Sequence, residues 1–245
     1  MFKPSLSLWS IVTLWLCLSG VFISCASYVT PGGPADFTTL TDPKLKKAYQ
    51  SRPAAKFPAN VAAIRVQAVG YQSDSLRGFG HGNYSVVTSL DVETEDDIIR
   101  MAAIPGIDDV VRINRLLLPE SLNSDLELRN AAAKLHTDMI FLYTFDTTFQ
   151  NHDVLRPLTT VSLGLAPTQT FKAQATAAGL LMDTRTGYIY AVLEETAKQG
   201  GLATAWGSSE AMQRARKKAE REAFDKLLAN FETTWPRVYR KHRQR

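Results

Sequence analysis

Cysteine is almost absent from this chain of 245 residues, which contains only Cys17 and Cys25. Both stand within the first 25 residues, so the rest of the chain has to fold without an internal disulfide. Its stability must therefore come from an ordinary apolar core. The residues that follow Cys25 are enough for one sizeable domain or two small ones.

Residue patterns typical of catalysis and metal binding are also missing. The four histidines, His81, His136, His152 and His242, do not show the short spacing of zinc ligands. No nucleophile elbow, Ser-x-x-Lys motif or glycosidase-like pair of carboxylates is present. We therefore assign no catalytic residue, no metal ligand and no cofactor, and we expect that the protein is not an enzyme.

A glycine-rich stretch from Gly78 to Gly82 contains Phe79 and His81. A phosphate-binding loop has a strand before it and a helix after it, but here the following residues predict a strand. We interpret the stretch as a hairpin turn. An exposed turn would place Phe79 and His81 where a partner can contact them.

The one long apolar run lies at the start of the chain, from Leu6 to Ile23, after the positive charge of Lys3. This pattern predicts a secretory signal peptide over residues 1–24. The segment Phe22-Ile23-Ser24-Cys25 resembles the lipobox of bacterial lipoproteins. The resemblance implies that Cys25 becomes the first mature residue and carries acyl chains such as palmitate, which anchor it to a membrane.

Two other outcomes stay open for this segment. Ser24-Cys25-Ala26 also suits an ordinary signal peptidase, which would cut before Ser27. The apolar run could instead remain as an uncleaved anchor, although about 18 residues is short for a membrane span. For a lipoprotein, Ala26 in place of the aspartate of inner-membrane retention predicts the bacterial outer membrane, facing the periplasm. Nucleic acid is not an expected partner there.

Four regions follow from composition. Residues 1–24 are the predicted signal peptide. Residues 25–58, rich in proline and without periodicity, are predicted to be a semi-stiff tether, although part of this segment could instead pack on the domain as irregular coil. Residues 59–232 form the folded domain. Residues 233–245 are basic and aromatic and are predicted to form a tail.

Helical and strand patterns alternate through the domain. Ser124 and Glu127 form a capping box, and the apolar start of Asp138–Phe149 is typical of a strand buried on both faces. This order favours an α/β fold in which a mixed sheet is flanked by helices, with a long C-terminal helix. The predicted strands are 61–71, 84–90, 110–118, 138–149, 161–165, 170–182 and 187–194, and the predicted helices are 94–103, 124–137 and 209–231.

Two segments resemble the anticodon-binding-like domain of envelope lipoproteins. They are Ala132–Tyr143 (AAKLHTDMIFLY) and Ala178–Ile189 (AGLLMDTRTGYI), although Thr144 stands where that family often has glycine. The family includes the curli secretion lipoprotein, activator lipoproteins of penicillin-binding proteins and the TolB amino-terminal domain. The chain also resembles bacterial envelope lipoproteins that open Cys-Ala-x-Tyr-Val-Thr-Pro-Gly, as residues 25–32 do. The resemblance implies the fold, but this fold carries unrelated functions.

The candidate partner contacts combine aromatic and basic side chains, which are typical interface anchors. We expect a membrane-anchored periplasmic lipoprotein that is a non-catalytic adaptor for another envelope protein, and an oligomer is compatible with this role. One alternative is a subunit of an oligomeric outer-membrane secretion pore, and a second is an enzyme acting on envelope polymers. The candidate contacts are Phe79, His81, Trp235, Arg237, Tyr239 and Arg240.

Overall fold

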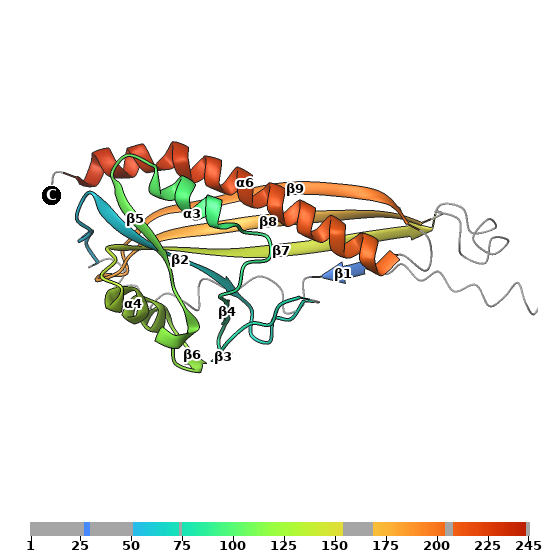
Figure 1. The fold of residues 1–245 in the computed structure, drawn as a ribbon, viewed down its shortest axis with the longest axis horizontal. Coiled ribbons are helices and arrows are strands. Elements are labelled where there is room, and N and C mark those ends of the chain that lie inside the picture. Colours follow the sequence, from blue (N-terminus) through green and yellow to red (C-terminus); the bar gives the residue numbers. More distant parts are fainter. Residues whose placement is uncertain (1–26, 30–50, 74, 154–168, 204–207, 244–245) are drawn as a thin grey trace, which may run out of the picture.

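A mixed seven-stranded sheet forms the centre of the computed structural model, which describes residues 27–29, 51–73, 75–153, 169–203 and 208–243 (Figure 1). The strand order is β4-β2-β7-β8-β9, with β5 also paired to β2 and β1 also paired to β7. Helices cover both faces, so the predicted α/β class is confirmed. The predicted strand at 161–165 lies outside the described residues.

The first half of the chain builds what we call the head around β2 (Ala59–Gln67). Strand β2 is parallel to β5 (Ile107–Arg112) and to β7 (Met139–Asp153). Antiparallel β4 (Ser85–Val87) adjoins the end of β2. The two crossovers contain α3 (Glu95–Ala102) and α4 (Asp125–Lys134), which lie on opposite faces of the sheet (Figure 1).

Both crossover helices start at a capping box. Thr94 pairs with Asp97 in α3, and Ser124 pairs with Glu127 in α4, as the sequence predicted for α4. The predicted strand 110–118 extends too far toward its C-terminal end, because β5 ends at Arg112. The Asn114 side chain accepts a hydrogen bond from the Leu116 backbone N–H and so starts a 3₁₀ turn over Arg115–Leu117.

Strands β7, β8 (Gln169–Asp183) and β9 (Ile189–Ala203) form an antiparallel meander, and each has 15 residues. Such strands are about 50 Å long. At the head, both faces of β7 are buried, since Ile140 and Phe141 are both 0% exposed. From Phe145 to Phe149 the buried residues alternate with partly or fully exposed ones. We call this part of the three strands (145–153, 169–178 and 194–203) the ribbon, and its far end, away from the head, the distal end.

Helix α6 (Ser208–His242) runs along the sheet from the ribbon to the head (Figure 1). Small residues meet in this contact. A Cβ at Gly179 would lie 2.8 Å from Cε2 of Phe141 on the neighbouring strand and 3.4 Å from Cδ1 of Leu227 on α6. The buried small residues are Ala173, Ala175 and Ala177 on β8 and Ala215, Ala219 and Ala223 on α6.

The predicted tail at 233–245 is wrong, because α6 continues through Pro236 to His242. Trp235 is 1% exposed, stacks 5.7 Å from the Phe231 ring, and donates its Nε1–H to the Pro105 carbonyl at 3.1 Å. Positions 231, 235, 238 and 242 are all buried and repeat the helical spacing. The basic residues between them hid this stripe in the sequence.

The predicted tether at 25–58 is wrong at both of its ends. Strand β1 (Ser27–Val29) pairs with β7 in the ribbon, with Ser27 opposite Gln150. Residues 51–58 lie against the head, where Phe57 packs edge-on 5.4 Å from the Tyr239 ring. Residues 30–50 between them lie outside the described part. Within the described ranges, no helix is long and apolar enough to cross a membrane.

Replacing Trp235 with alanine tests whether the end of α6 belongs to the core. Because Trp235 is enclosed, Trp235→Ala should lower the free energy of unfolding by roughly 3–5 kcal/mol in urea titrations. The exposed neighbour Arg237 is the matched control, and Arg237→Ala should change stability by less than about 0.5 kcal/mol. A negligible effect of Trp235→Ala would show that the end of the helix is not part of the core.

Candidate interaction surfaces

The glycine-rich stretch forms a turn that is fixed against the head. Phe79 and Val86 exchange two backbone hydrogen bonds, of 2.8 and 2.9 Å. Strand β3 (His81–Gly82) then pairs in parallel with β6 (Ser121–Leu122). Phe79 is half-buried against the apolar cluster beneath α4, whereas the His81 side chain is exposed. Of the two candidates in this turn, His81 is the one available to a partner.

The candidates on α6 divide in the same way. Trp235 is buried in the core, so the expectation that it contacts a partner is wrong. Tyr239 is half-buried between Phe57 and Gly106, and the side chains of Arg237 and Arg240 are exposed. These residues belong to the α6 side of the sheet and Phe79 to the α4 side. The structure therefore does not bring the two groups of candidates into one site.

Asp183 fixes a turn and also holds a distant segment of the chain. Its carboxylate is 0% exposed and accepts the backbone N–H groups of Arg185 and Thr186, which close the turn between β8 and β9. It also accepts the Ala54 N–H at 2.7 Å and the Tyr190 hydroxyl at 2.7 Å. Burial raises the pKa of Tyr190, and the bond to Asp183 raises it further.

These bonds hold residues 53–57 beside the end of α6 and leave a cavity there of about 500 Å³. The rings of Tyr188 and Tyr190 pack edge-on against His242 nearby. This cavity could not be predicted from local patterns, because residues 51–58 show no periodicity. Its lining residues are Pro53, Ala54, Ala55, Lys56, Phe57, His242 and Arg243.

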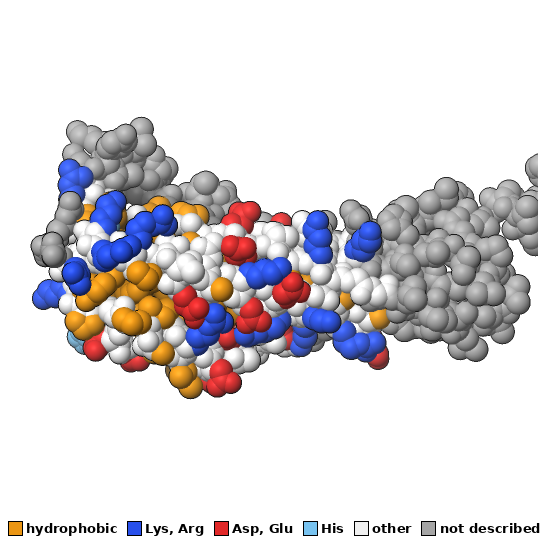
Figure 2. Space-filling model, turned by 90° about the horizontal axis from the view of Figure 1, so that it is seen from above, with side chains coloured by type: hydrophobic (Ala, Val, Ile, Leu, Met, Phe, Trp, Pro, Cys, Tyr) orange, Lys and Arg blue, Asp and Glu red, His pale blue; other side chains and the backbone are white. Residues whose placement is uncertain are grey.

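Exposed cations gather at this end of the head (Figure 2). Most arginines elsewhere in the fold are held in ion pairs, such as Arg100 with Glu232 and Arg129 with Asp125. Arg185 at this end pairs with Asp138, but five other cations here form no ion pair with any residue that the structure describes. We call them the head-end cations: Lys56, Arg237, Arg240, Lys241 and Arg243.

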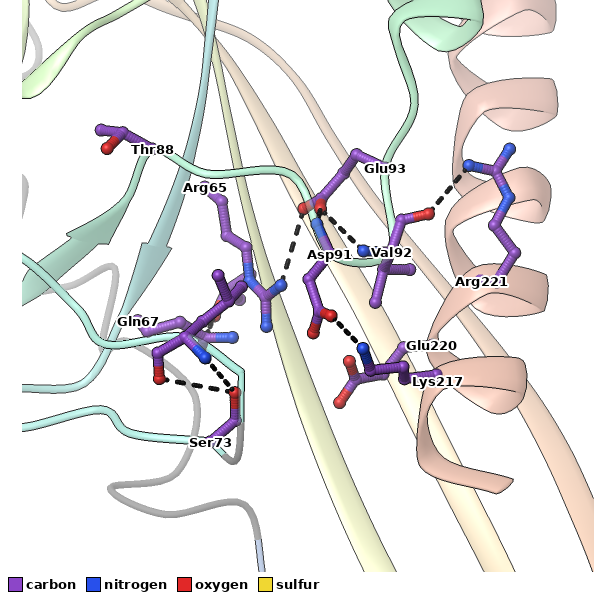
Figure 3. A network of polar contacts seen from close by, with 12 residues as sticks. Arg65, Gln67, Ser73, Thr88, Asp91, Val92, Glu93, Lys217, Glu220 and Arg221 are labelled. Carbon is purple, nitrogen blue, oxygen red and sulfur yellow. Dashed lines mark hydrogen bonds and ion pairs between the residues drawn. The ribbon is translucent and has the colours of Figure 1, made fainter. Parts of the chain in front are cut away.

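A second set of charges lies in the interior, between the sheet and α6 (Figure 3). The loop between β4 and α3 places Asp91 and Glu93 there. The Asp91 carboxylate, 3% exposed, lies 3.2 Å from Arg216 Nη2 and 2.5 Å from Lys217 Nζ. Arg221 of α6 donates to the Val92 carbonyl at 3.1 Å. The loop is thus fastened to α6 by charged contacts.

Arg65 of β2 is the most enclosed cation of this network, at 1% exposed. Its Nη2 donates to the Tyr71 hydroxyl at 3.0 Å, and its Nη1 lies 3.7 Å from Glu93 Oε1. Its guanidinium lies 4.6 Å from the centre of the Phe145 ring. Among the described atoms, Nε and Nη1 have no hydrogen-bond acceptor. Because the side chains of Arg65, Glu93, Arg216 and Glu220 are each 3% exposed or less, this part of the network positions the loop and offers no group to a solute.

The described part of the chain contains no candidate metal site, because no three His, Cys, Asp or Glu side chains are grouped to hold an ion. Cys25 lies outside the described residues, two positions before β1.

The Asp91 contacts predict a loss of stability in acid. Burial alone would raise the pKa of Asp91, but the hydrogen bonds and charges of Lys217 and Arg216 hold it below its ordinary value. A lowered carboxyl pKa stabilises the fold above the ordinary value near about 4, and this stabilisation is lost as the pH falls through the lowered pKa. Asp91→Asn should cost roughly 1.5–3 kcal/mol at pH 7, because it removes the charged hydrogen bonds to Arg216 and Lys217 while Arg216 keeps its ion pair with Glu220.

Urea titrations at pH 7 and pH 3 measure this effect. The difference between Asp91→Asn and the wild type should shrink at pH 3, because below its ordinary pKa the carboxyl takes up a proton in the unfolded chain. Exposed Asp96 gives the control, since Asp96→Asn should change stability little at either pH. A difference that stays the same at both pH values would contradict the role of the ionised carboxylate.

Comparison with known proteins gives no family assignment. No family model matches the chain, and no curated protein sequence matches it. Among solved structures, the chain is similar to the crystal structure of protein XCC0632 from Xanthomonas campestris, described by the family model DUF330. The sequence identity is 11%, the TM-score is 0.33, and the match covers 85% of this chain and 98% of that chain. A similarity of this size supports no argument about function.

Proposed function

We propose that the protein is a lipid-anchored, non-catalytic adaptor of the bacterial periplasm that binds an acidic envelope protein through its head-end cations. The observation that carries this proposal is the position of β1. If Cys25 is acylated, the lipid anchor is close to the ribbon, and the head-end cations are at the other end of the molecule.

The anchor end follows from chain geometry. Cys25 stands two residues before Ser27, so its Cα is at most about 7 Å from that of Ser27. Ser27 pairs with Gln150 of the ribbon. From Gln150 back to Met139 at the head, β7 spans 11 residue steps, or about 36 Å. A molecule held at Cys25 can therefore hold its head well above the lipid headgroups.

The binding end follows from charge. The head-end cations are exposed and have no carboxylate partner in the described part of the chain. Arg237, Arg240 and Lys241 lie on the last turns of α6, a rigid support that the buried Trp235 holds in place. Rigid arginines next to apolar side chains suit an acidic protein surface, because the charges speed encounter and the apolar contacts slow dissociation.

Spin-labelled lipids test the orientation. The acylated protein is labelled with a fluorophore at a single introduced cysteine, Gly201→Cys in the ribbon or Arg240→Cys at the head, and placed on vesicles with spin-labelled headgroups. The Gly201→Cys label should be quenched and the Arg240→Cys label should not. Mass spectrometry of the mature N-terminus should find an acylated Cys25, and Cys25→Ser should abolish the quenching. Quenching at position 240 would place the head-end cations on anionic lipid instead.

Charge reversal tests the binding end. Arg237→Glu combined with Arg240→Glu should weaken capture of partners from solubilised envelope membranes by at least tenfold, and 0.5 M salt should have a similar effect on the wild type. Arg77→Glu combined with Lys218→Glu makes the same change in net charge at exposed positions elsewhere and should leave capture unchanged. Equal losses for both double variants would show that only net charge matters and would remove the head-end cations from the site.

A further inference from the structure

The open face of the ribbon carries two unpaired lysines beside the expected anchor. Lys172 of β8 and Lys198 of β9 are exposed, and neither forms an ion pair with any described residue. The pairing of β8 with β9 sets Lys172 opposite Gly200 and Gln174 opposite Lys198. The two lysines are therefore diagonal neighbours on one face, within reach of a single anion.

A hollow accompanies these lysines on the ribbon. Its volume is about 500 Å³. Gly200 contributes no side chain opposite Lys172, which leaves room beside the ammonium group. The hollow contains no acidic residue among those that line it: Thr148, Lys172, Ala173, Gln174, Lys198, Gln199 and Gly200. It therefore offers positive charge and amide and hydroxyl groups together, which is the chemistry that a phosphate group requires.

The strand register places this hollow at the level of the lipid anchor. Ser27 of β1 pairs with Gln150, Gln150 pairs with Lys172, and Lys172 pairs with Gly200, so that these residues form one row across the sheet. Two strand spacings separate Ser27 from Lys172, or about 10 Å. Cys25 adds at most about 7 Å to this distance. Lys172 is thus within about 17 Å of the atom that would carry the lipid.

We propose that this hollow binds the phosphate of an anionic phospholipid headgroup, with Lys172 and Lys198 as its ligands. The proposal rests on the proposed lipid anchor at Cys25. It adds a headgroup contact to the acyl chains, and a contact at this level would fix the rotation of the ribbon about its axis. The row runs across the ribbon, so an upright ribbon holds both lysines near the membrane surface while the head-end cations stay away from it.

Lysine footprinting on vesicles tests the proposal with the acylated full-length protein. An amine-reactive reagent modifies exposed lysines, and mass spectrometry gives the modified fraction at each position. On vesicles of phosphatidylglycerol and phosphatidylethanolamine, Lys172 and Lys198 should react at least fivefold more slowly than on phosphatidylcholine vesicles. Lys218 on α6 and Lys241 at the head should react equally on both, since they lie outside the hollow. Inorganic phosphate added to phosphatidylcholine vesicles should give no protection, which distinguishes the lipid from the free ion.

Two variants distinguish binding in the hollow from a general attraction of lysines to an anionic membrane surface. Lys172→Gln should reduce the protection of Lys198 about fivefold, because each lysine near an anionic surface contributes a factor of roughly five to binding. Lys218→Gln removes the same charge from an exposed position outside the hollow and should leave the protection of Lys198 unchanged. Flotation with phosphatidylcholine vesicles reports the acyl anchor alone. A protein that floats with them, but whose Lys172 and Lys198 react equally fast on phosphatidylglycerol and on phosphatidylcholine vesicles, overturns this proposal and leaves the anchor standing. Equal protection of every lysine also overturns it.

Discussion

Close packing of α6 on the sheet is the contact on which the rest of the structure depends. Alanines on β8 face alanines on α6, and Gly179 leaves space that the ring of Phe141 fills. Without this contact the ribbon would be an isolated three-stranded sheet with one apolar face exposed to water. The same helix ends at the head, where Trp235 joins it to the carbonyl of Pro105. One element thus stabilises both halves of the molecule and fixes their relative position.

The charged side chains of the protein form two groups, one paired in the interior and one exposed on the surface. Interior charges, such as those of Asp91 and Arg216, are paired and enclosed, and they attach the loop before α3 to α6. Exposed cations without a described ion pair include the head-end cations and, on the ribbon, Lys172 and Lys198, while others such as Arg77 and Lys218 lie elsewhere. This division gives the molecule two distinct ends, although its overall charge is only +4. It is also the reason that we assign different partners to the two ends.

The sequence predicted the elements that local patterns determine and missed what long-range contacts decide. The capping box at Ser124 and the doubly buried strand around Ile140 are local signals, and both are confirmed. The end of α6 was missed because basic residues surround the buried positions of Trp235 and Val238. The pairing of β1 could not be found, since three residues carry no periodicity and their partner is more than 100 residues away. The cavity depends on Asp183 reaching Ala54, which no spacing reveals.

The length of the molecule is constrained because its strands and its long helix advance by different distances per residue. A strand residue advances the chain by about 3.3 Å and a helix residue by 1.5 Å, so one strand residue corresponds to about two helix residues. A single insertion in β8 would turn every later side chain to the other face, and one in α6 would rotate its alanine stripe by about 100°. A longer ribbon would need matched insertions in β7, β8, β9 and α6 together. We therefore expect the distance between the two ends to change in evolution far more slowly than the residues displayed at either end.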